Sequence, residues 1–333
     1  MISLGIDAGT KSYEVFWLED DKPSKLSFST QEVRKNPQCL IETLEEINPD
    51  VAAGLSGYGL PVKPFRELTE RDVLLMTLSK DVPAVGLRGV ISILRRRELP
   101  IYTIPGVIHL PTVSKWRKLN RIDMGTYDKL CSTVLAVYEF SSDTPLEKLN
   151  FVLVEAGFGF NAFIAVKGGK IVDGIGGTSG FPSYSSLGCM DAELAYLLGN
   201  FPKSLLFKGG VSELDASEEE KAEWLAELTL RGVRAVDTAV KADLVAASGR
   251  MFKDRNFLRT FCKLASDFGY EVKPVTGFGL AKQSAEGAAI IANGIAGGEF
   301  SNIVEHMEIL KAKGTILDYL TPEFKSKIHL INI

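Results

Sequence analysis

One strand–turn–strand pattern occurs twice in the sequence, 148 residues apart. In the first copy, an alternating apolar run from Ile2 to Ile6 is followed by the turn-prone stretch DAGTK and by two further strand-like runs that end at Ser29. In the second copy, over 151–173, VEAG takes the place of IDAG, so that Asp7 aligns with Glu155. A repeat this long indicates a duplicated domain rather than a solenoid, whose units are shorter.

After each copy, segments with helical and strand-like periodicity alternate along the chain. This order predicts, in each half, a mixed sheet covered by helices on both faces. A chain of 333 residues is also long enough for two domains. We therefore predict an α/β protein with one domain over 1–140 and a second over 141–333. The last residues, from about 301, are expected to form one or two helices and a tail strand over 328–333, and this segment could pack back on the first domain.

The composition argues against several classes of protein. With 38 basic and 42 acidic residues, the chain lacks the basic character of nucleic-acid-binding proteins, so no nucleic-acid partner is expected. No apolar run approaches the ~18–20 residues of a membrane span, and the N-terminus does not have the pattern of a signal peptide. We therefore expect a cytoplasmic protein without membrane association. The four cysteines are widely spaced and are expected to be reduced thiols.

The turn that follows the first strand is a candidate phosphate site. Gly9 would let backbone N–H groups approach an anion closely, and the hydroxyl of Thr10 would add a donor. Asp7 is placed to hold Mg²⁺, which usually keeps much of its water when it binds a protein. An ordinary β-turn closed by the aspartate side chain is the alternative for the same residues.

The second copy repeats this chemistry. Glu155, with Gly157 and Gly159, would form a matching turn on the other domain. Two such turns would hold one triphosphate from both sides, and their two carboxylates would face the same metal ion. The alternative is a pair of unrelated hairpins with glycine turns.

Five segments, taken in order, resemble the superfamily of acetate kinases, sugar kinases, heat-shock chaperone ATPases and actin. LGIDAGTKS and LVEAGFG resemble its two phosphate segments, LVAASGRM its adenosine loop, and RIDMGTYDKLCSTVLAVYEF and AKQSAEGAAIIANGIAGG its two connecting helices. The resemblance implies two duplicated ribonuclease-H-like domains with an ATP-binding cleft between them, and ATP and Mg²⁺ as cofactors. It also implies cofactor contacts from Asp7, Gly9, Thr10, Lys11, Glu155, Gly157, Gly159, Ser248, Gly249, Arg250 and Glu286, of which Asp7 and Glu155 would hold the metal. The adenosine loop departs from the pattern of the superfamily, since a Gly-Gly pair is usual where this chain has Ser248-Gly249-Arg250.

Within the superfamily, the chain is most similar to the acetate- and butyrate-kinase branch, which includes an archaeal family described as predicted butyrate kinases. Acetate kinases carry the stretch FHGTSHK, which MGTYDK resembles here except that Met124 and Asp128 replace the two histidines. His109 is similar to an acetate-kinase histidine near a proline and is a candidate substrate contact; a histidine packed in a loop is the alternative. Asp123 is a candidate acid/base or metal-orienting group, or alternatively the cap of the connecting helix.

Two arginines by which acetate kinases bind their substrates are missing from the corresponding stretches of this chain, 54–60 and 176–191. Loss of such a positive clamp can cost roughly 10³–10⁵ in the rate of phosphoryl transfer. Arg117, Lys118 or Arg121 could take this part, and we include Arg121 with Asp123 and His109 among the candidate catalytic residues. A solvated basic face over 115–121 is the alternative.

These patterns favour an ATP-dependent kinase that phosphorylates a small carboxylate. The alternative is a nucleotide-binding switch or scaffold with weak or no kinase activity, which the missing arginines support; a hydroxyl acceptor is a third hypothesis. The Gly- and Ser-rich stretch 174–188 is expected to bind the acceptor, or else to be a flexible surface connection. A homodimer is a further expected arrangement.

Overall fold

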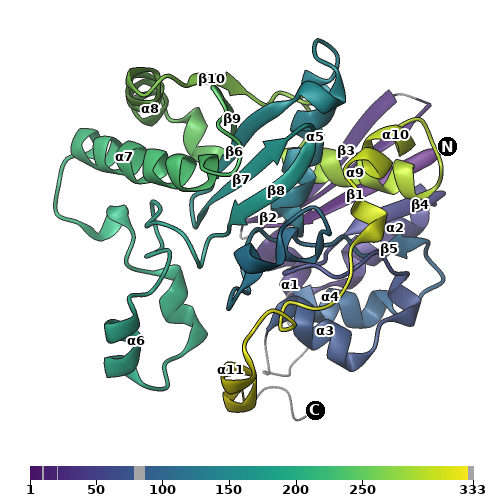
Figure 1. Cartoon of the computed structure of the whole chain (residues 1–333). Coiled ribbons are helices and arrows are strands. Elements are labelled where there is room, and N and C mark those ends of the chain that lie inside the picture. The colour runs from purple at the N-terminus through teal and green to yellow at the C-terminus, as the bar shows by residue number, and fades with distance from the viewer. Residues whose placement is uncertain (10, 21, 79–86, 329–333) are drawn as a thin grey trace. The chain divides into compact units, whose positions relative to one another are not determined.

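The computed structural model describes residues 1–9, 11–20, 22–78 and 87–328 (Figure 1). The chain divides into two compact units. Unit 1 comprises Met1–Ile122, Thr126–Glu139 and Thr276–Ile333, and unit 2 comprises Asp123–Gly125 and Phe140–Val275. The second domain predicted over 141–333 therefore differs from unit 2, because everything from Thr276 onward belongs to unit 1.

The sheet of unit 1 is mixed. Its antiparallel meander continues into two parallel strands, and the order of the described strands is β3-β2-β1-β4-β5. The strands are β1 (Ile2–Ala8), β2 (Ser12–Glu19), β3 (Lys22–Ser29), β4 (Val51–Gly54) and β5 (Ile101–Tyr102).

The sheet of unit 2 has the same topology. Its described strands run in the order β8-β7-β6-β9-β10, again a meander followed by two parallel strands. The strands are β6 (Asn150–Ala156), β7 (Asn161–Lys167), β8 (Lys170–Ile175), β9 (Leu244–Ser248) and β10 (Glu271–Pro274). The two meanders lie in two separate sheets with equivalent strand order, which confirms the predicted α/β fold built from a duplicated unit.

The duplication extends to the register of the strands. Asp7 pairs with Glu14 across the first hairpin, and Glu155 pairs with Ala162 across the second, so that both partners are shifted by the same 148 residues. The turn of each hairpin is closed by the same bond, from the glycine N–H to the carbonyl three residues later. The predicted alignment of Asp7 with Glu155 therefore describes equivalent positions in three dimensions.

Most helices lie along the two sheets (Figure 1). Those of unit 1 are α1 (Thr30–Lys35), α2 (Gln38–Ile47), α3 (Glu70–Thr77), α4 (Leu87–Leu94), α5 (Tyr127–Phe140, whose last residue is assigned to unit 2), α9 (Gln283–Ile295), α10 (Ser301–His306) and α11 (Pro322–Lys327). Those of unit 2 are α6 (Ala192–Leu198), α7 (Glu218–Asp237) and α8 (Arg255–Asp267). Helices α6 and α11 lie apart from the sheet of their own unit and contain no buried residue (Figure 1). No helix in the described part of the chain is long and apolar enough to span a membrane.

Small residues explain why the C-terminal part of the chain returns to unit 1. A side chain at Gly5 of β1 would collide with the backbone of α9 at Ala285 and Ala289, and one at Gly287 of α9 would collide with the carbonyl of Cys131 in α5. Glycine at these two positions lets α9 pack closely against both β1 and α5. The tail strand predicted over 328–333 falls, apart from Ile328, outside the described residues.

Candidate functional site

The turn after β1 is fixed by its own backbone and by a threonine. Asp7 is the penultimate residue of β1. The Gly9 N–H donates to the carbonyl of Ser12 at 3.0 Å, and the Gly9 carbonyl accepts from the hydroxyl of Thr30 at 2.8 Å. The N–H of Gly9 is thus engaged inside the turn, although it was a predicted phosphate donor. Thr10 lies outside the described residues, and the predicted neighbour Lys11 is exposed.

A buried carboxylate and a half-buried one interact in unit 1. Asp7 is 4% exposed, and burial raises its pKa, an effect that Lys282 opposes and Asp128 reinforces. Burial would also raise the pKa of Asp128, but the ammonium of Lys129, 2.7 Å away, and a hydrogen bond from Thr126 outweigh it and hold this pKa below its ordinary value. Asp128 is therefore held as an anion, while Asp7 lacks full compensation for its charge.

This pair of carboxylates fits a partly hydrated magnesium ion. Across the described ranges, no group of three or more His, Cys, Asp or Glu side chains is placed to hold a metal. Mg²⁺ does not need such a cage, because it is usually bound by one or two carboxylates, several waters and the phosphates of its substrate. Asp7 and Asp128 supply carboxylates of that kind in unit 1. Glu155, the other predicted metal ligand, is a half-buried residue of unit 2.

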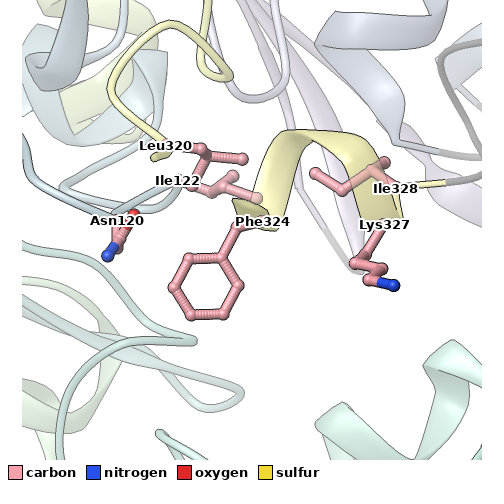
Figure 2. A pocket seen from close by; sticks show the side chains of 6 residues that line it. All are labelled: Asn120, Ile122, Leu320, Phe324, Lys327 and Ile328. Atoms are coloured by element: carbon pink, nitrogen blue, oxygen red, sulfur yellow. The ribbon is translucent and has the colours of Figure 1, made fainter. Parts of the chain in front are cut away.

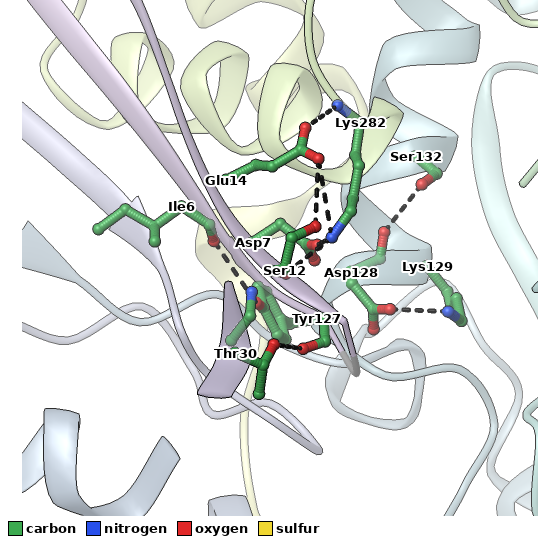
Figure 3. A network of polar contacts seen from close by, with 12 residues as sticks. Ile6, Asp7, Ser12, Glu14, Thr30, Tyr127, Asp128, Lys129, Ser132 and Lys282 are labelled. Carbon is green, nitrogen blue, oxygen red and sulfur yellow. Dashed lines mark hydrogen bonds and ion pairs between the residues drawn. The ribbon is translucent and has the colours of Figure 1, made fainter. Parts of the chain in front are cut away.

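A lysine from the C-terminal part of the chain completes the group around Asp7 (Figure 3). Nζ of Lys282 lies 3.0 Å from Oδ2 of Asp7 and 2.8 Å from the carbonyl oxygen of Ser12. The backbone N–H of Lys282 donates to the carboxylate of Glu14 at 2.7 Å. On the other side of the turn, the Tyr127 hydroxyl accepts from the Ala8 N–H at 3.1 Å. Strands β1 and β2 and the starts of α5 and α9 therefore converge on one polar cluster.

Glu286 organises the loop that precedes α9. It is 1% exposed, and its two oxygens accept from the N–H groups of Phe278, Leu280 and Ala281 at 2.8, 3.0 and 2.8 Å. Burial raises its pKa, which these three bonds oppose. Both oxygens of Glu286 are engaged in this loop, and its contact with the cofactor stays a prediction.

Unit 2 brings the predicted second turn and the predicted adenosine loop together. The Gly157 N–H donates to the Phe160 carbonyl at 2.9 Å, and the Gly159 carbonyl accepts from the hydroxyl of Ser183 at 2.6 Å. In the next strand, Ser248 is paired in register with Glu155. These contacts place one end of β6, one end of β9 and the Gly- and Ser-rich stretch side by side.

The predicted adenosine loop depends on a glycine. Gly249 has a φ of +101°, and a side chain there would meet the backbone of Ala156 at the end of β6. The preceding Ser248 is 2% exposed, and its hydroxyl is buried without a hydrogen-bond partner among the described residues. Arg250 is exposed and begins the 3-10 helix Arg250–Lys253. An unpaired buried hydroxyl is costly to keep, so it is a reasonable place for a ligand contact.

Asp123 holds the Gly- and Ser-rich stretch in place. Its carboxylate accepts from the Thr178 N–H at 3.0 Å, the Thr178 hydroxyl at 2.9 Å and the Gly125 N–H at 3.1 Å. The helix α5 begins only at Tyr127, so the alternative that Asp123 caps this helix is wrong. The stretch itself is not a loose surface connection, because Ser183 and Ser186 within it are fully buried.

The other two candidate catalytic residues have contrasting environments. His109 is 2% exposed; Nδ1 accepts from the Gly106 N–H at 3.1 Å, and the buried Nε2 has no hydrogen-bond partner in the described part of the chain. Burial lowers the pKa of His109 to about 4, so this side chain is neutral near pH 7. Arg121 is exposed. Direct contact of a substrate with His109 would require the residues that cover it to move.

Lys118 does not belong to a solvated basic face. It is 2% exposed, and its ammonium donates to the carbonyl of Leu110 at 2.7 Å and to the hydroxyl of Tyr319 at 3.2 Å. Burial lowers its pKa to about 8. Its contacts join the segment after β5 to the C-terminal segment of unit 1.

A pocket of about 310 Å³ lies beside this C-terminal segment (Figure 2). It is lined by Asn120, Ile122, Leu320, Phe324, Lys327 and Ile328. The side-chain oxygen of Asn120 is already engaged, since it accepts from the Thr321 N–H at 2.9 Å. None of the predicted site residues lines this pocket, so it is separate from the cluster around Asp7.

Residues 5–322 match the family described as "Protein of unknown function (DUF1464)". The chain belongs to this family. The match spans both units and includes the turn after β1, Asp123, the predicted adenosine loop and α9. No curated protein matches the chain. The more specific resemblance to butyrate kinases therefore gains no support from a family assignment.

Solved structures identify the fold of this DUF1464 protein. The acetate kinase from Entamoeba histolytica superposes with a TM-score of 0.57 at 11% sequence identity, covering 80% of this chain and 87% of that one. A ROK family glucokinase from Streptomyces griseus, solved with glucose and AMPPNP, gives a TM-score of 0.48 at 14% identity, over 88% of this chain and 99% of that one. The ROK hexokinase from Thermus thermophilus gives a TM-score of 0.43 at 13% identity, over 87% of this chain and 97% of that one. The chain has the two-domain α/β fold of acetate kinase.

Three members of the cluster around Asp7 were not predicted from the sequence: Glu14, Lys282 and the hydroxyl of Tyr127. Asp128 was noted only as a departure from the acetate-kinase pattern. Glu14 carries a weak signal, because a charged residue in an otherwise apolar and aromatic strand needs a partner. Lys282 carries none, since its partner Asp7 is 275 residues away in the sequence.

Proposed function

We propose that the chain is an ATP-dependent phosphotransferase that transfers the γ-phosphoryl group to a small carboxylate. The observation that carries the proposal is the buried, incompletely compensated carboxylate of Asp7 at the end of β1, next to a turn that is repeated at the equivalent place in unit 2. The fold shared with acetate kinase supports the same reaction class. Asp7, with Asp128, would hold Mg²⁺, which when bound neutralises charge on the phosphates.

Unit 2, taken by itself, carries a second set of proposed nucleotide contacts. Glu155 and the second turn would bind phosphate. Gly249 would let the nucleoside approach the backbone closely, and the unpaired hydroxyl of Ser248 would gain a partner there. The Gly- and Ser-rich stretch held by Asp123 would receive the acceptor through its amides and hydroxyls.

The environment of Asp123 favours a carboxylate acceptor over a hydroxyl acceptor. A hydroxyl group must lose a proton as it attacks phosphorus, so it needs a general base within reach. Asp123 makes three hydrogen bonds through its carboxylate, and His109 is buried. A carboxylate is already ionised near pH 7 and attacks without a proton transfer. The proposed reaction therefore forms an acyl phosphate and ADP with no base from the protein.

A coupled assay for ADP release tests this function. The full-length protein is given Mg-ATP with a series of short-chain carboxylates, with sugars and other alcohols, or with no acceptor. We expect ADP release that depends on a carboxylate. Release that depends on an alcohol would support the hydroxyl-directed alternative, and ATP binding without acceptor-dependent release would support a nucleotide-binding switch or scaffold.

A further inference from the structure

Two substrate-binding arginines of acetate kinases are missing from the corresponding stretches of this chain, and Lys282 brings a positive charge to the turn after β1. Its ammonium lies 3.0 Å from Asp7, 2.8 Å from the Ser12 carbonyl and 3.9 Å from Oε1 of Glu14. It therefore binds the predicted metal ligand and the carbonyl that closes the phosphate turn. No arginine needs to be invoked to bring positive charge to this turn.

The glycine of the turn makes room for this ammonium. Gly9 does not have a positive φ, so its backbone conformation alone would accept other residues. A side-chain carbon at this position, however, would lie 2.6 Å from Nζ of Lys282. Gly9, which the sequence suggested for close approach of a phosphate, thus leaves room for the ammonium of Lys282, which would have to shift if a side chain stood there.

The position of Lys282 is otherwise unfavourable, which argues that the residue is there for its charge. It is the N-cap residue of α9, and its side chain makes no capping hydrogen bond. Asp, Asn, Ser and Thr stabilise helix starts, whereas a cation there opposes the helix dipole. Glu14 offsets this effect by accepting from the Lys282 N–H at 2.7 Å and by lying within ion-pair distance of its ammonium.

The lysine is more accessible than the aspartate that it binds. The side chain of Lys282 is 34% exposed, whereas that of Asp7 is 6% exposed. An ammonium has three N–H donors, and the Asp7 carboxylate and the Ser12 carbonyl take two of them. A third donor on the exposed side of a buried carboxylate suits a phosphate oxygen.

We propose that Lys282 is a phosphate-binding cation of this protein. Its ammonium, which lies beside Asp7, would contact the terminal phosphates of a nucleoside triphosphate. This inference rests on the proposed ATP-dependent function. In the proposed site, the Ser12 carbonyl and the space at Gly9 determine where the ammonium lies, and Glu14 holds the backbone of Lys282. The carboxylate of Asp7 would interact with both the lysine and the metal ion.

Nucleotide affinities of the full-length protein test the proposal, measured by calorimetry with Mg-ATP and with AMP. Lys282→Met should weaken ATP binding by about 10- to 100-fold, since a charge-assisted hydrogen bond is lost, and should change AMP binding by less than about twofold. Lys282→Arg should restore most of the ATP affinity. Gly9→Ala should weaken ATP binding less than Lys282→Met does, because a side chain there would lie 2.6 Å from Nζ of Lys282 and the flexible end of the lysine would have to shift.

Lys311→Met is the matched control, because it removes an exposed lysine of unit 1 that is paired with Glu308. Circular dichroism and the melting temperature of each variant show whether it is folded. Equal losses of ATP and AMP affinity in Lys282→Met, or no loss of either, would overturn the role of Lys282 while leaving ATP binding by the wild type intact. A gain in Mg-ATP affinity would overturn it as well, because the lysine would then be blocking the metal. A wild type that binds neither nucleotide would overturn both this inference and the proposed function.

Discussion

The carboxylate of Asp123 accepts both the N–H and the hydroxyl of Thr178, at 3.0 and 2.9 Å, across 55 residues of sequence. The main-chain carbonyl of Asp123 accepts from the same stretch, through the Gly176 N–H at 3.3 Å and the Ser179 hydroxyl. A side chain at Gly176 would collide with the Asp123 carboxylate, so the glycine and the aspartate require each other. One aspartate thus determines the path of the stretch that we propose to bind the acceptor.

Asp123→Ala should destabilise unit 2 by about 2–4 kcal/mol, because it leaves the buried N–H of Gly125 and the partly buried N–H and hydroxyl of Thr178 without their partner. Urea denaturation measures this loss, and hydrogen exchange should show faster exchange at 176–180. Asp123→Asn keeps one side-chain oxygen as an acceptor and should lose less stability. If Asp123 acts instead as a general base, Asp123→Asn will abolish turnover and leave hydrogen exchange at 176–180 unchanged.

The fold was largely predictable because its determinants are local in the sequence. Alternation of apolar residues and glycine turns predicted both meanders. The offset of 148 residues between the two copies of the pattern predicted that Asp7 and Glu155 are equivalent. The site was less predictable, because its members are brought together by packing. Lys282 reaches Asp7 only because Gly5 allows α9 to lie on β1, and nothing in the residues around Lys282 specifies that contact.

The burial of His109 also could not be predicted from the local sequence. Its resemblance to a substrate-binding histidine depended on a short local pattern near a proline. Its burial depends on residues far along the chain, such as Lys313, whose N–H donates to the His109 carbonyl at 3.0 Å. A pattern of a few residues can predict the type of loop. Whether a side chain in that loop is exposed to solvent depends on which distant segments of the chain pack against it.

Gly249→Ala should destabilise unit 2 by roughly 1–3 kcal/mol or more, because φ of +101° is strained for alanine and its side chain meets the backbone of Ala156. Urea denaturation provides the measurement. Gly159→Ala is the matched control from the same unit, since a side chain there has nothing within 4 Å; we expect it to change stability by less than about 0.5 kcal/mol. Equal effects of the two substitutions would show that Gly249 is not constrained by β6.

Asp7→Asn should abolish most of the thermal stabilisation by Mg-ATP. A ligand that binds only the folded state raises the melting temperature by mass action, and the amide is a much weaker ligand for Mg²⁺ than the carboxylate. Melting temperatures with and without millimolar Mg-ATP test this, with Asp267→Asn on the exposed end of α8 as the control. An unchanged shift in Asp7→Asn would remove Asp7 from the metal site.

His109→Asn should reduce the loss of stability on acidification. The folded-state pKa of His109 is about 4, below its ordinary value of 6.5, so between these values the unfolded chain binds more protons than the folded one. Stability therefore rises with pH across this window, and the contribution of neutral His109 is present above pH 6.5 and is lost as the pH falls toward 4. The lost contribution is on the order of 3 kcal/mol.

Asparagine at position 109 retains an acceptor for the Gly106 N–H but does not titrate, so the wild type should lose more stability than the variant between pH 7 and 4. Urea denaturation at a series of pH values measures the difference, with His306→Asn, at the partly exposed histidine of α10, as the control variant. Parallel curves for the wild type and His109→Asn would mean that His109 is accessible to protons in the folded protein, and would restore it as a candidate substrate contact.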